Sequence, residues 1–308
     1  MIPRKIVVGS RTSRLALIQT ELVVAEMKRV SPGTVFTVEK IVTHGDRDRQ
    51  IPLDREEAAG IFIKELEEAL LEKKIDIAIH SLKDVPERIT AGLCLAATTE
   101  RLEPGDVLVT RGLSLAQLPP GSRIGTDSLR RSIQLLRQRK DLEVHSLRGN
   151  VDTRVGKVVQ GELDGIILAA AGLIRLGLQD RISQYLPIDD FLPAPGQGAL
   201  AIEIRQDDCQ VYQLVSQVNH LPTWQSVTAE RALLTALGVD CDVPIAALGR
   251  VTDGWLTLTG MVASRDGNVL LQRKAEGDAR EAGRVGERLA RMMLESGASE
   301  LIAGLRRK

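Results

Sequence analysis

The first part of the chain alternates short apolar segments with helical segments, and this alternation limits the possible folds more than any other feature of the sequence. Residues 5–9, 35–42 and 75–80 are rich in β-branched and apolar side chains and predict strands. Residues 13–29 and 62–71 lie between them and carry apolar residues at helical spacing. Strands that alternate with helices indicate βαβ units on a mainly parallel sheet.

A second block of the same kind begins near Pro104. We expect its strands at 107–110, 123–125, 143–146 and 165–169, and its helices at 128–139 and 151–160. The Pro-rich stretch 192–198 then interrupts the pattern and precedes one more expected strand, 199–204. Because a Pro-rich stretch is stiff, it is suited to carry the chain back to the first block.

The pattern changes near Thr223, where a helix to Leu237 leads into a loop that holds Cys241. The dipeptides Asp253-Gly254 and Asp266-Gly267 are hairpin signals between alternating segments. A long helix over 279–294 is expected to finish the chain. The fold class that follows is α/β, with two α/β lobes and a small α+β C-terminal domain.

Composition and charge exclude several classes of protein. Lys and Arg number 41, and Asp and Glu also number 41, so the surplus of cations that a nucleic-acid binder needs is missing. The three cysteines have no metal-ligand spacing, so we expect neither a disulfide scaffold nor a zinc or other metal site. The first residues show no signal-type apolar core, and the apolar run 166–173 is too short to span a bilayer. We therefore expect a cytoplasmic protein with reduced thiols.

Basic residues recur where the strands of the two blocks should end. Arg11 follows the first strand, Lys83 follows 75–80, and Arg148 follows 143–146, while Arg130 and Arg131 follow 123–125. Ligands of open α/β sheets sit at the carboxyl ends of strands, and arginine forks there suit carboxylates. The pattern predicts a small polyanionic ligand. Solvated surface arginines are the alternative for each residue taken singly.

Two further residues could carry chemistry. Asp84 follows an apolar strand and is adjacent to Lys83, so its carboxylate could hold a proton or stabilise a developing cation. A cap on a helix or turn is the alternative for this residue. Cys241 lies in a turn-rich loop, where a thiol is accessible and could act as a nucleophile. By contrast, Cys94 is expected to be a small buried apolar residue, and Cys209 to lie at a helix start.

Seven segments, taken in order, carry a resemblance to one family. They are Thr43 to Arg47, His80 to Pro86, Ile124 to Arg131, Leu147 to Arg154, Ala171 to Leu176, Pro193 to Ala199, and Ala229 to Arg231 leading into the Cys241 loop. With these motifs the chain resembles the porphobilinogen deaminases (hydroxymethylbilane synthases). The resemblance implies two periplasmic-binding-protein-like lobes, residues 1–98 with 199–218 and residues 99–198, and a cofactor-attachment domain at 219–308.

The resemblance also implies the reaction and the site. Porphobilinogen would lose ammonia and be polymerised into the linear tetrapyrrole hydroxymethylbilane, on a dipyrromethane cofactor attached through Cys241. Asp84 would be the catalytic carboxylate. Implied cofactor contacts, besides Cys241 and Asp84, are Ser81, Lys83, Thr126, Ser128, Arg130, Arg131 and Arg148. Implied substrate contacts are Arg11, Ser13, Gln19, Phe62, Arg154 and Arg175.

Three departures from the pattern that this resemblance implies can be seen. Ala59 replaces a loop lysine before Phe62, Val239 and Asp240 replace two glycines before the cysteine, and Asp127 stands where a serine is common. The first bears on loop contacts, and the second bears on how easily the cofactor is loaded.

Two other classes of protein remain to be weighed. A non-enzymatic two-lobe carboxylate-binding protein would fit the lobes, but it would not explain the loop cysteine or Asp84. A nucleic-acid binder does not fit the zero net charge or the 2% of aromatic residues. The expected partner is thus a small-molecule substrate, with neither nucleic acid nor membrane, and the protein is expected to be monomeric.

Overall fold

The computed structural model describes residues 5–47, 63–239 and 243–306. The chain divides into two compact units. One unit comprises residues 1–102 and 199–224, and the other comprises residues 103–198 and 225–308. The first unit thus consists of two stretches of chain.

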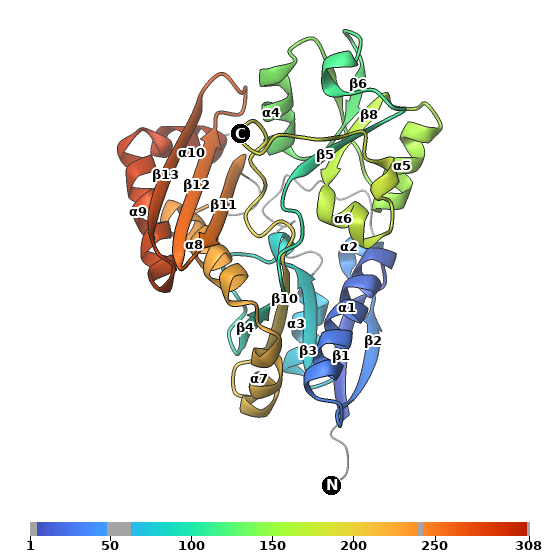
Figure 1. Cartoon of the computed structure of the whole chain (residues 1–308), viewed down its shortest axis with the longest axis vertical. Coiled ribbons are helices and arrows are strands. Elements are labelled where there is room, and N and C mark those ends of the chain that lie inside the picture. The colour runs from blue at the N-terminus through green and yellow to red at the C-terminus, as the bar shows by residue number, and fades with distance from the viewer. Residues whose placement is uncertain (1–4, 48–62, 240–242, 307–308) are drawn as a thin grey trace. The chain divides into compact units, whose positions relative to one another are not determined.

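The first unit is built on a five-stranded sheet with the order β2-β1-β3-β10-β4 (Figure 1). Its strands are β1 (Lys5–Arg11), β2 (Val35–Ile41), β3 (Ile77–Ser81), β4 (Leu93–Thr98) and β10 (Leu200–Arg205). β1 pairs in parallel with β2 and β3, whereas β10 runs antiparallel to both of its neighbours. Four strands therefore share one direction, which agrees with the expected mainly parallel sheet. β4 was not expected from the sequence.

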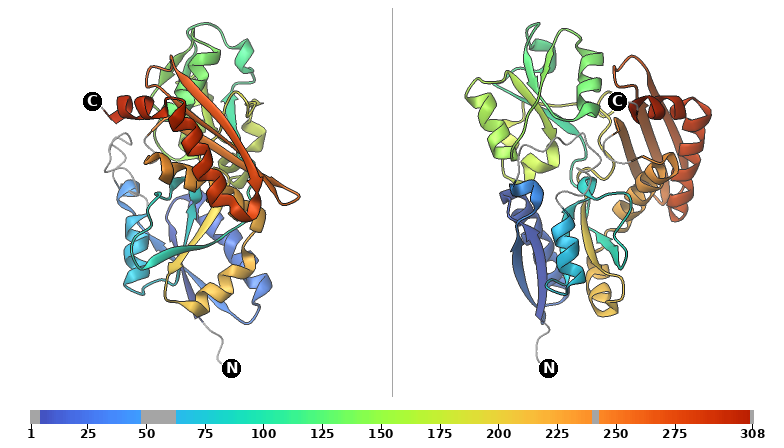
Figure 2. Two further views of the ribbon diagram at one scale, coloured as in Figure 1. Left: turned by 90° about the vertical axis from the view of Figure 1, so that its left-hand side faces the viewer. Right: turned by 180° about the vertical axis from the view of Figure 1, so that it is seen from behind.

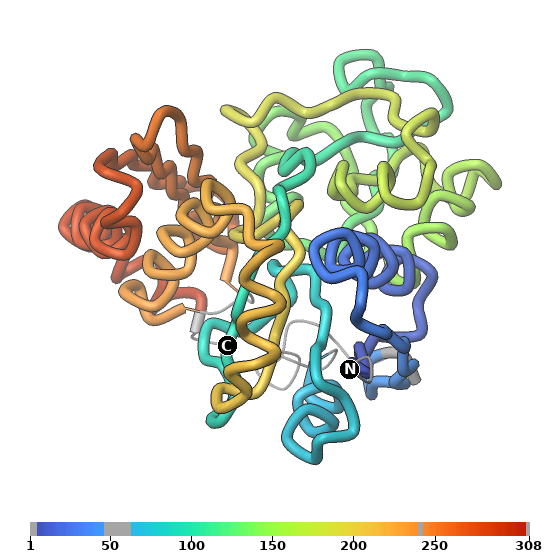
Figure 3. Tube along the Cα trace, turned by 60° about the horizontal axis from the view of Figure 1, so that its bottom comes forward, coloured from blue at the N-terminus to red at the C-terminus, as the bar shows by residue number. Residues whose placement is uncertain are grey.

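Helices cover both faces of this sheet. The helices of the unit are α1 (Arg14–Val30), α2 (His44–Arg47), α3 (Lys64–Leu71) and α7 (Cys209–Val215). One core joins α1 and α7 to the sheet through residues such as Met27, Ile202 and Val211. The opposite face packs on α3 through Leu66 and Leu70. The path from β10 into the gold helix α7 can be followed in Figure 3.

The second unit contains a similar sheet with the order β7-β6-β8-β5-β9. Its strands are β5 (Asp106–Thr110), β6 (Arg123–Gly125), β7 (Glu143–His145), β8 (Gly165–Ala169) and β9 (Gln184–Tyr185). β6 lies between β7 and β8 and is parallel to both, whereas β5 is antiparallel to β8 and β9. α5 (Val151–Val159) and α6 (Ala170–Arg175) pack on one face, and α4 (Leu129–Gln138) packs on the other.

A three-stranded antiparallel sheet, β11-β12-β13, belongs to the same unit. Its strands are β11 (Ile245–Thr252), β12 (Trp255–Ala263) and β13 (Leu270–Asp278). The first expected hairpin is confirmed, because Thr252 pairs with Trp255 across a two-residue turn. Asp253 and Gly254 both have positive φ there, at 50° and 77°, as a type I′ turn requires.

Helices α8 (Leu221–Leu237), α9 (Ala282–Glu295) and α10 (Ala298–Arg306) share one core with this sheet, and Figure 2 shows α9 and α10 against it. The other face packs on Ile133 of α4 and on Leu192. The expectation that the helix over 279–294 finishes the chain is wrong, because α10 follows α9 after a break at Ser296 and Gly297. Apolar residues such as Ile302 bury one side of α10. The α/β fold class with a small α+β part is confirmed.

Candidate active site

The carboxyl ends of β1 and β3 bring together four predicted residues of the first unit. β1 ends at Arg11 and the parallel strand β3 ends at Ser81. Ser13 caps α1, where its hydroxyl accepts a hydrogen bond from the Ala16 N–H at 3.3 Å. The buried Gln19 exchanges hydrogen bonds of 2.9 and 3.3 Å with the Ser81 hydroxyl. These residues share one edge of the first sheet.

Asp84 and Lys83 lie in a single 3-10 turn, η2 (Leu82–Asp84), that directly follows β3. The buried Leu82 anchors this turn, and its N–H donates to the Ala199 carbonyl at 3.0 Å. The Asp84 side chain is exposed, and within the residues that the structure describes its carboxylate has no hydrogen bond or ion pair. The alternative role of Asp84 as a cap is therefore not supported, and the carboxylate is accessible to a ligand.

In the second unit, the carboxyl ends of β6 and β7 form a comparable edge. Thr126 is buried just after β6, and its hydroxyl accepts from the Ser128 N–H at 3.2 Å. Ser128 is the N-cap of α4. Arg148 follows the parallel strand β7, and Arg154 of α5 donates from Nε to the Gly149 carbonyl at 2.7 Å. Basic and hydroxyl side chains thus follow the ends of both strands.

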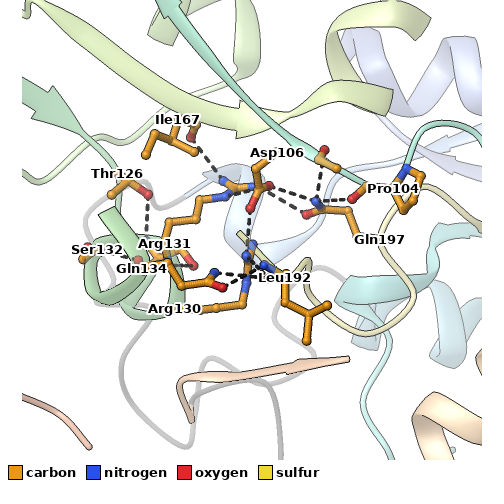
Figure 4. A network of polar contacts seen from close by, with 12 residues as sticks. Pro104, Asp106, Thr126, Arg130, Arg131, Ser132, Gln134, Ile167, Leu192 and Gln197 are labelled. Carbon is orange, nitrogen blue, oxygen red and sulfur yellow. Dashed lines mark hydrogen bonds and ion pairs between the residues drawn. The ribbon is translucent and has the colours of Figure 1, made fainter. Parts of the chain in front are cut away.

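Arg130 and Arg131 are buried in a network around Asp106 (Figure 4). Arg130 Nη1 donates to Asp106 Oδ2 and to the Leu192 carbonyl, each at 2.7 Å. Arg131 donates to Asp106 Oδ1 from Nε at 3.0 Å and from Nη2 at 2.8 Å, and Gln197 Nε2 donates to the same oxygen at 2.9 Å. The carboxylate therefore accepts hydrogen bonds at both oxygens.

This network fixes the charge of its members. Burial opposes the ionisation of Asp106, but the positive charges of Arg130 and Arg131 outweigh it and hold the pKa of Asp106 well below its usual range. Two guanidinium groups share one carboxylate, so the network keeps one net positive charge. Whether Arg130 and Arg131 also contact the cofactor directly stays a prediction.

Arg175 is in a different situation. It ends α6, which directly follows β8, and its Nη2 donates to the Gly198 carbonyl at 2.7 Å. In the described part of the chain no carboxylate pairs with it. Burial lowers the pKa of Arg175 to about 10, which still leaves it cationic at neutral pH. A desolvated cation without an acid partner is energetically unfavourable, and a ligand carboxylate would relieve this cost.

Two of the predicted site residues, Phe62 and Cys241, lie outside the described residues, as do Ala59 and Asp240. The chain on both sides of the Cys241 segment is buried. Val239 and Val243 are buried in the core formed by α8, α9 and the three-stranded sheet. Both flanks of the segment are therefore held in one core.

Three buried carboxylates were missed by the sequence analysis: Asp106, Glu203 and Glu230. Glu203, in β10, lies 2.9 Å from His80 Nε2. Glu230, in α8, accepts from the Gly196 N–H at 2.6 Å and from the Gly249 N–H at 2.7 Å. The sequence signal for these residues is an acid within or beside an apolar run. Such an acid needs a polar partner once it is buried.

Comparison with known proteins decides the family. The model of the porphobilinogen deaminase dipyrromethane cofactor binding domain matches residues 6–213, and the model of the porphobilinogen deaminase C-terminal domain matches residues 224–295. The chain belongs to the porphobilinogen deaminase family. The porphobilinogen deaminase of Geobacter metallireducens is 46% identical over 303 residues, which cover 98% of this chain and 95% of that protein. The enzyme of Thermus thermophilus is 47% identical over 305 residues, which cover 98% of this chain and 100% of that protein.

Among solved structures, the methionine binding protein MetQ has a TM-score of 0.45 at 15% identity, covering 73% of this chain and 93% of MetQ. The sulphonate binding protein SsuA from Escherichia coli has a TM-score of 0.39 at 15% identity, covering 76% of this chain and 70% of SsuA.

The family assignment confirms the function expected from the motifs. The chain is an enzyme of tetrapyrrole biosynthesis, a transferase that acts on a small-molecule substrate and contains the family's dipyrromethane cofactor binding domain. A cofactor attached through a cysteine fits this family. The alternative, a non-enzymatic carboxylate-binding protein, is not favoured. Within residues 5–47, 63–239 and 243–306, no helix combines the length and the apolar character needed to cross a membrane.

Proposed function

We propose that this chain is a monomeric, cytoplasmic porphobilinogen deaminase that binds no nucleic acid, with Asp84 as its catalytic carboxylate and Cys241 as its cofactor attachment. The proposed cofactor contacts are Ser81, Lys83, Asp84, Thr126, Ser128, Arg130, Arg131 and Arg148. The proposed substrate contacts are Arg11, Ser13, Gln19, Phe62, Arg154 and Arg175. The proposal includes three domains, formed by residues 1–98 with 199–218, by residues 99–198 and by residues 219–308.

The described residues fit a cofactor that carries several carboxylates. Cations follow β1, β6, β7 and β8, at the carboxyl ends where α/β sheets bind ligands. The Asp106 network keeps a surplus positive charge, and helix starts such as that of α4 favour anions through their exposed N–H groups. When bound, a dipyrromethane supplies a primer with a free pyrrole α-carbon.

The observation that carries the proposal is the burial of Arg175 without a carboxylate partner among the described residues. Burial lowers its pKa, yet among the described residues no carboxylate compensates its charge. Substrate pyrroles carry acetate and propionate groups, so one of these carboxylates would complete the ion pair. Arginine suits this task because its planar fork binds a carboxylate through two hydrogen bonds.

Asp84 would act through its charge. Loss of ammonia from the aminomethyl group of porphobilinogen leaves positive charge on the pyrrole ring. A carboxylate close to the ring N–H stabilises that charge and can hold the ring proton. Asp84 suits this role because its carboxylate is exposed while the buried Leu82 fixes the turn beneath it.

Substitution of Arg175 tests the proposal. Charge-assisted hydrogen bonds contribute about 1.5–3 kcal/mol, so Arg175→Leu should lower kcat/KM for porphobilinogen by roughly 10- to 150-fold. Arg181→Leu is the matched control, because Arg181 is exposed and lies a few residues further along the chain. It should turn over like the wild type.

The result that contradicts the proposal is an Arg175→Leu variant with wild-type kcat/KM. Such a result would mean that Arg175 only supports the Gly198 carbonyl. Equal losses of kcat/KM in Arg175→Leu and Arg181→Leu would also contradict the proposal, because they would indicate an effect of overall charge rather than a binding site.

Zero net charge and 2% aromatic residues support the absence of a nucleic-acid partner. The monomeric state is tested by sedimentation equilibrium of the purified protein.

A further inference from the structure

We propose that Asp127 is a positioning residue that orients the guanidinium of Arg148 toward ligand carboxylates. This inference rests on the proposed role of Arg148 as an anion-binding residue. Asp127 itself would contact no ligand, and its effect would pass through Arg148.

The register of two parallel strands brings Asp127 beside the segment that carries Arg148. Ile124 of β6 pairs with Val144 of β7, and Gly125 pairs with His145. One residue further on, the Thr126 N–H donates to the His145 carbonyl at 2.9 Å. The two loops that follow these strands therefore begin side by side, and Asp127 lies in the first of them.

One oxygen of Asp127 fastens the second loop. Oδ1 accepts from the Ser146 hydroxyl at 2.6 Å and from the Leu147 N–H at 3.0 Å. Leu147 is fully buried in the core beneath α5, so this part of the loop has little freedom. Arg148 is the next residue, and the direction in which its side chain leaves the backbone is set by these two hydrogen bonds.

The other oxygen faces the charge of Arg148. Asp127 Oδ2 is buried, has no hydrogen bond within the described residues, and lies 3.9 Å from Arg148 Nε. The Arg148 side chain is 34% exposed, whereas that of Asp127 is 15% exposed. The attraction thus holds the guanidinium at its Nε side. Because Arg148 is the more exposed partner, a ligand carboxylate would meet this pair at Arg148.

A charge is needed for this role, and hydrogen bonding alone does not supply it. Asparagine at position 127 retains an oxygen that can accept from Ser146 and Leu147. Its Nδ2 would, however, place N–H groups opposite Arg148 Nε–H, where donors repel each other. Asp127→Asn should therefore keep the hydrogen bonds that hold the loop, while it removes the charge that orients Arg148.

A double-mutant cycle tests the inference. Asp127→Asn, Arg148→Leu and the double variant are compared with the wild type for KM, kcat and the distribution of enzyme–pyrrole adducts by intact mass. A partly exposed ion pair predicts that Asp127→Asn raises KM about 2- to 5-fold with little change in kcat. The same substitution in the Arg148→Leu background should have no further effect.

Asp164→Asn is the matched control. Like Asp127, Asp164 accepts from a backbone N–H and lies close to an arginine. Its Oδ2 accepts from the Arg123 backbone N–H at 2.9 Å and from Arg123 Nε at 3.3 Å. It precedes β8, at the opposite end of that strand from the proposed ligands. Asp164→Asn should leave KM and the adduct distribution unchanged.

A second readout does not depend on cofactor or turnover. The Nε–Hε resonance of Arg148, assigned by its loss in Arg148→Leu, should be resolved in the wild-type NMR spectrum. In Asp127→Asn it should move into the envelope of solvent-exposed arginines. If Asp127→Asn fails to fold, Asp127→Ser keeps one acceptor for the loop and removes the charge.

The outcomes are distinguishable. Additive effects in the cycle, or an unmoved Arg148 resonance in Asp127→Asn, would overturn the positioning role. If Arg148→Leu carries the cofactor and shows the same distribution of enzyme–pyrrole adducts as the wild type, the proposed function of Arg148 fails. The resonance then still decides whether Asp127 holds the side chain.

Discussion

Replacing Asp106 by asparagine tests whether the buried network is held by charge. Asp106 is fully buried, and its oxygens accept four hydrogen bonds of 2.7 to 3.0 Å from Arg130, Arg131 and Gln197. Asparagine keeps the shape but leaves two buried guanidinium groups without a counter-charge. Loss of one partner from a buried ion pair costs about 3–5 kcal/mol. For a unit of this size, the melting temperature should fall by roughly 10 °C.

The assay must separate the fall in melting temperature due to the broken network from a fall due to loss of the cofactor. This is necessary because a bound group stabilises the folded state. Asp106→Asn is therefore made in a Cys241→Ser background, which removes the proposed attachment sulfur, and is compared with Cys241→Ser alone. Asp141→Asn serves as the control. It removes an exposed carboxylate 2.6 Å from Arg139, so the melting temperature should stay within error.

The pH dependence gives a second check on the same substitution. Because the pKa of Asp106 is held well below its usual range, the stability that it contributes is complete above its unfolded pKa of about 3.9. This contribution is lost only as the pH falls from there toward the folded pKa. The loss of unfolding free energy caused by Asp106→Asn should thus be the same at neutral and mildly acidic pH, and it should become smaller in stronger acid. A loss of unfolding free energy below about 1 kcal/mol at neutral pH, or a loss that grows on acidification, would falsify this reasoning.

Two further predictions concern single carboxylates. Glu230→Gln should lower the free energy of unfolding by about 3 kcal/mol in urea titration, because the amide N–H₂ would face the N–H of Gly196 or Gly249; an unchanged midpoint would refute it. Asp84→Asn should lower single-turnover ammonia release by roughly 10²- to 10⁴-fold without shifting the thermal melt, and Asp84→Glu should retain part of the activity. If Asp84→Asn works within a few-fold of the wild type, another group must stabilise the ring.

Local patterns predicted most strands of the two α/β blocks, together with α1, α3, α4 and α5, because each of these elements buries its own apolar face. The strands at 123–125 and 165–169 match β6 and β8 to the residue. The expected helices began one residue early at Ser13 and at Ser128, since these serines are N-caps rather than helical residues. By contrast, β4 was missed because it contains Cys94, which was interpreted only as an apolar side chain.

The site was predictable where it depends on chain order and not where it depends on contacts between distant segments. Arg148 follows a strand, so strand prediction alone placed it at a sheet edge, whereas Arg175 was implied only by the family motif. The partner of Arg130 and Arg131 lies more than 20 residues earlier, in an apolar strand, and no local pattern links Asp106 to them. Asp127 was seen as a departure from a motif, but its contacts with Ser146 and Leu147 depend on the register of β6 and β7.

The position of β10 has a consequence for how the chain is made. During synthesis from the N-terminus, β3 and β4 emerge early, but the strand that pairs with both of them follows only after residues 103–198. The second α/β sheet has all five of its strands by Tyr185, before β10 exists. The inserted sheet is therefore complete first, while the edges of β3 and β4 are still unpaired and available to other chains. Synthesis stalled between Tyr185 and Arg205 would leave a nascent chain with one finished sheet and one that is prone to aggregate.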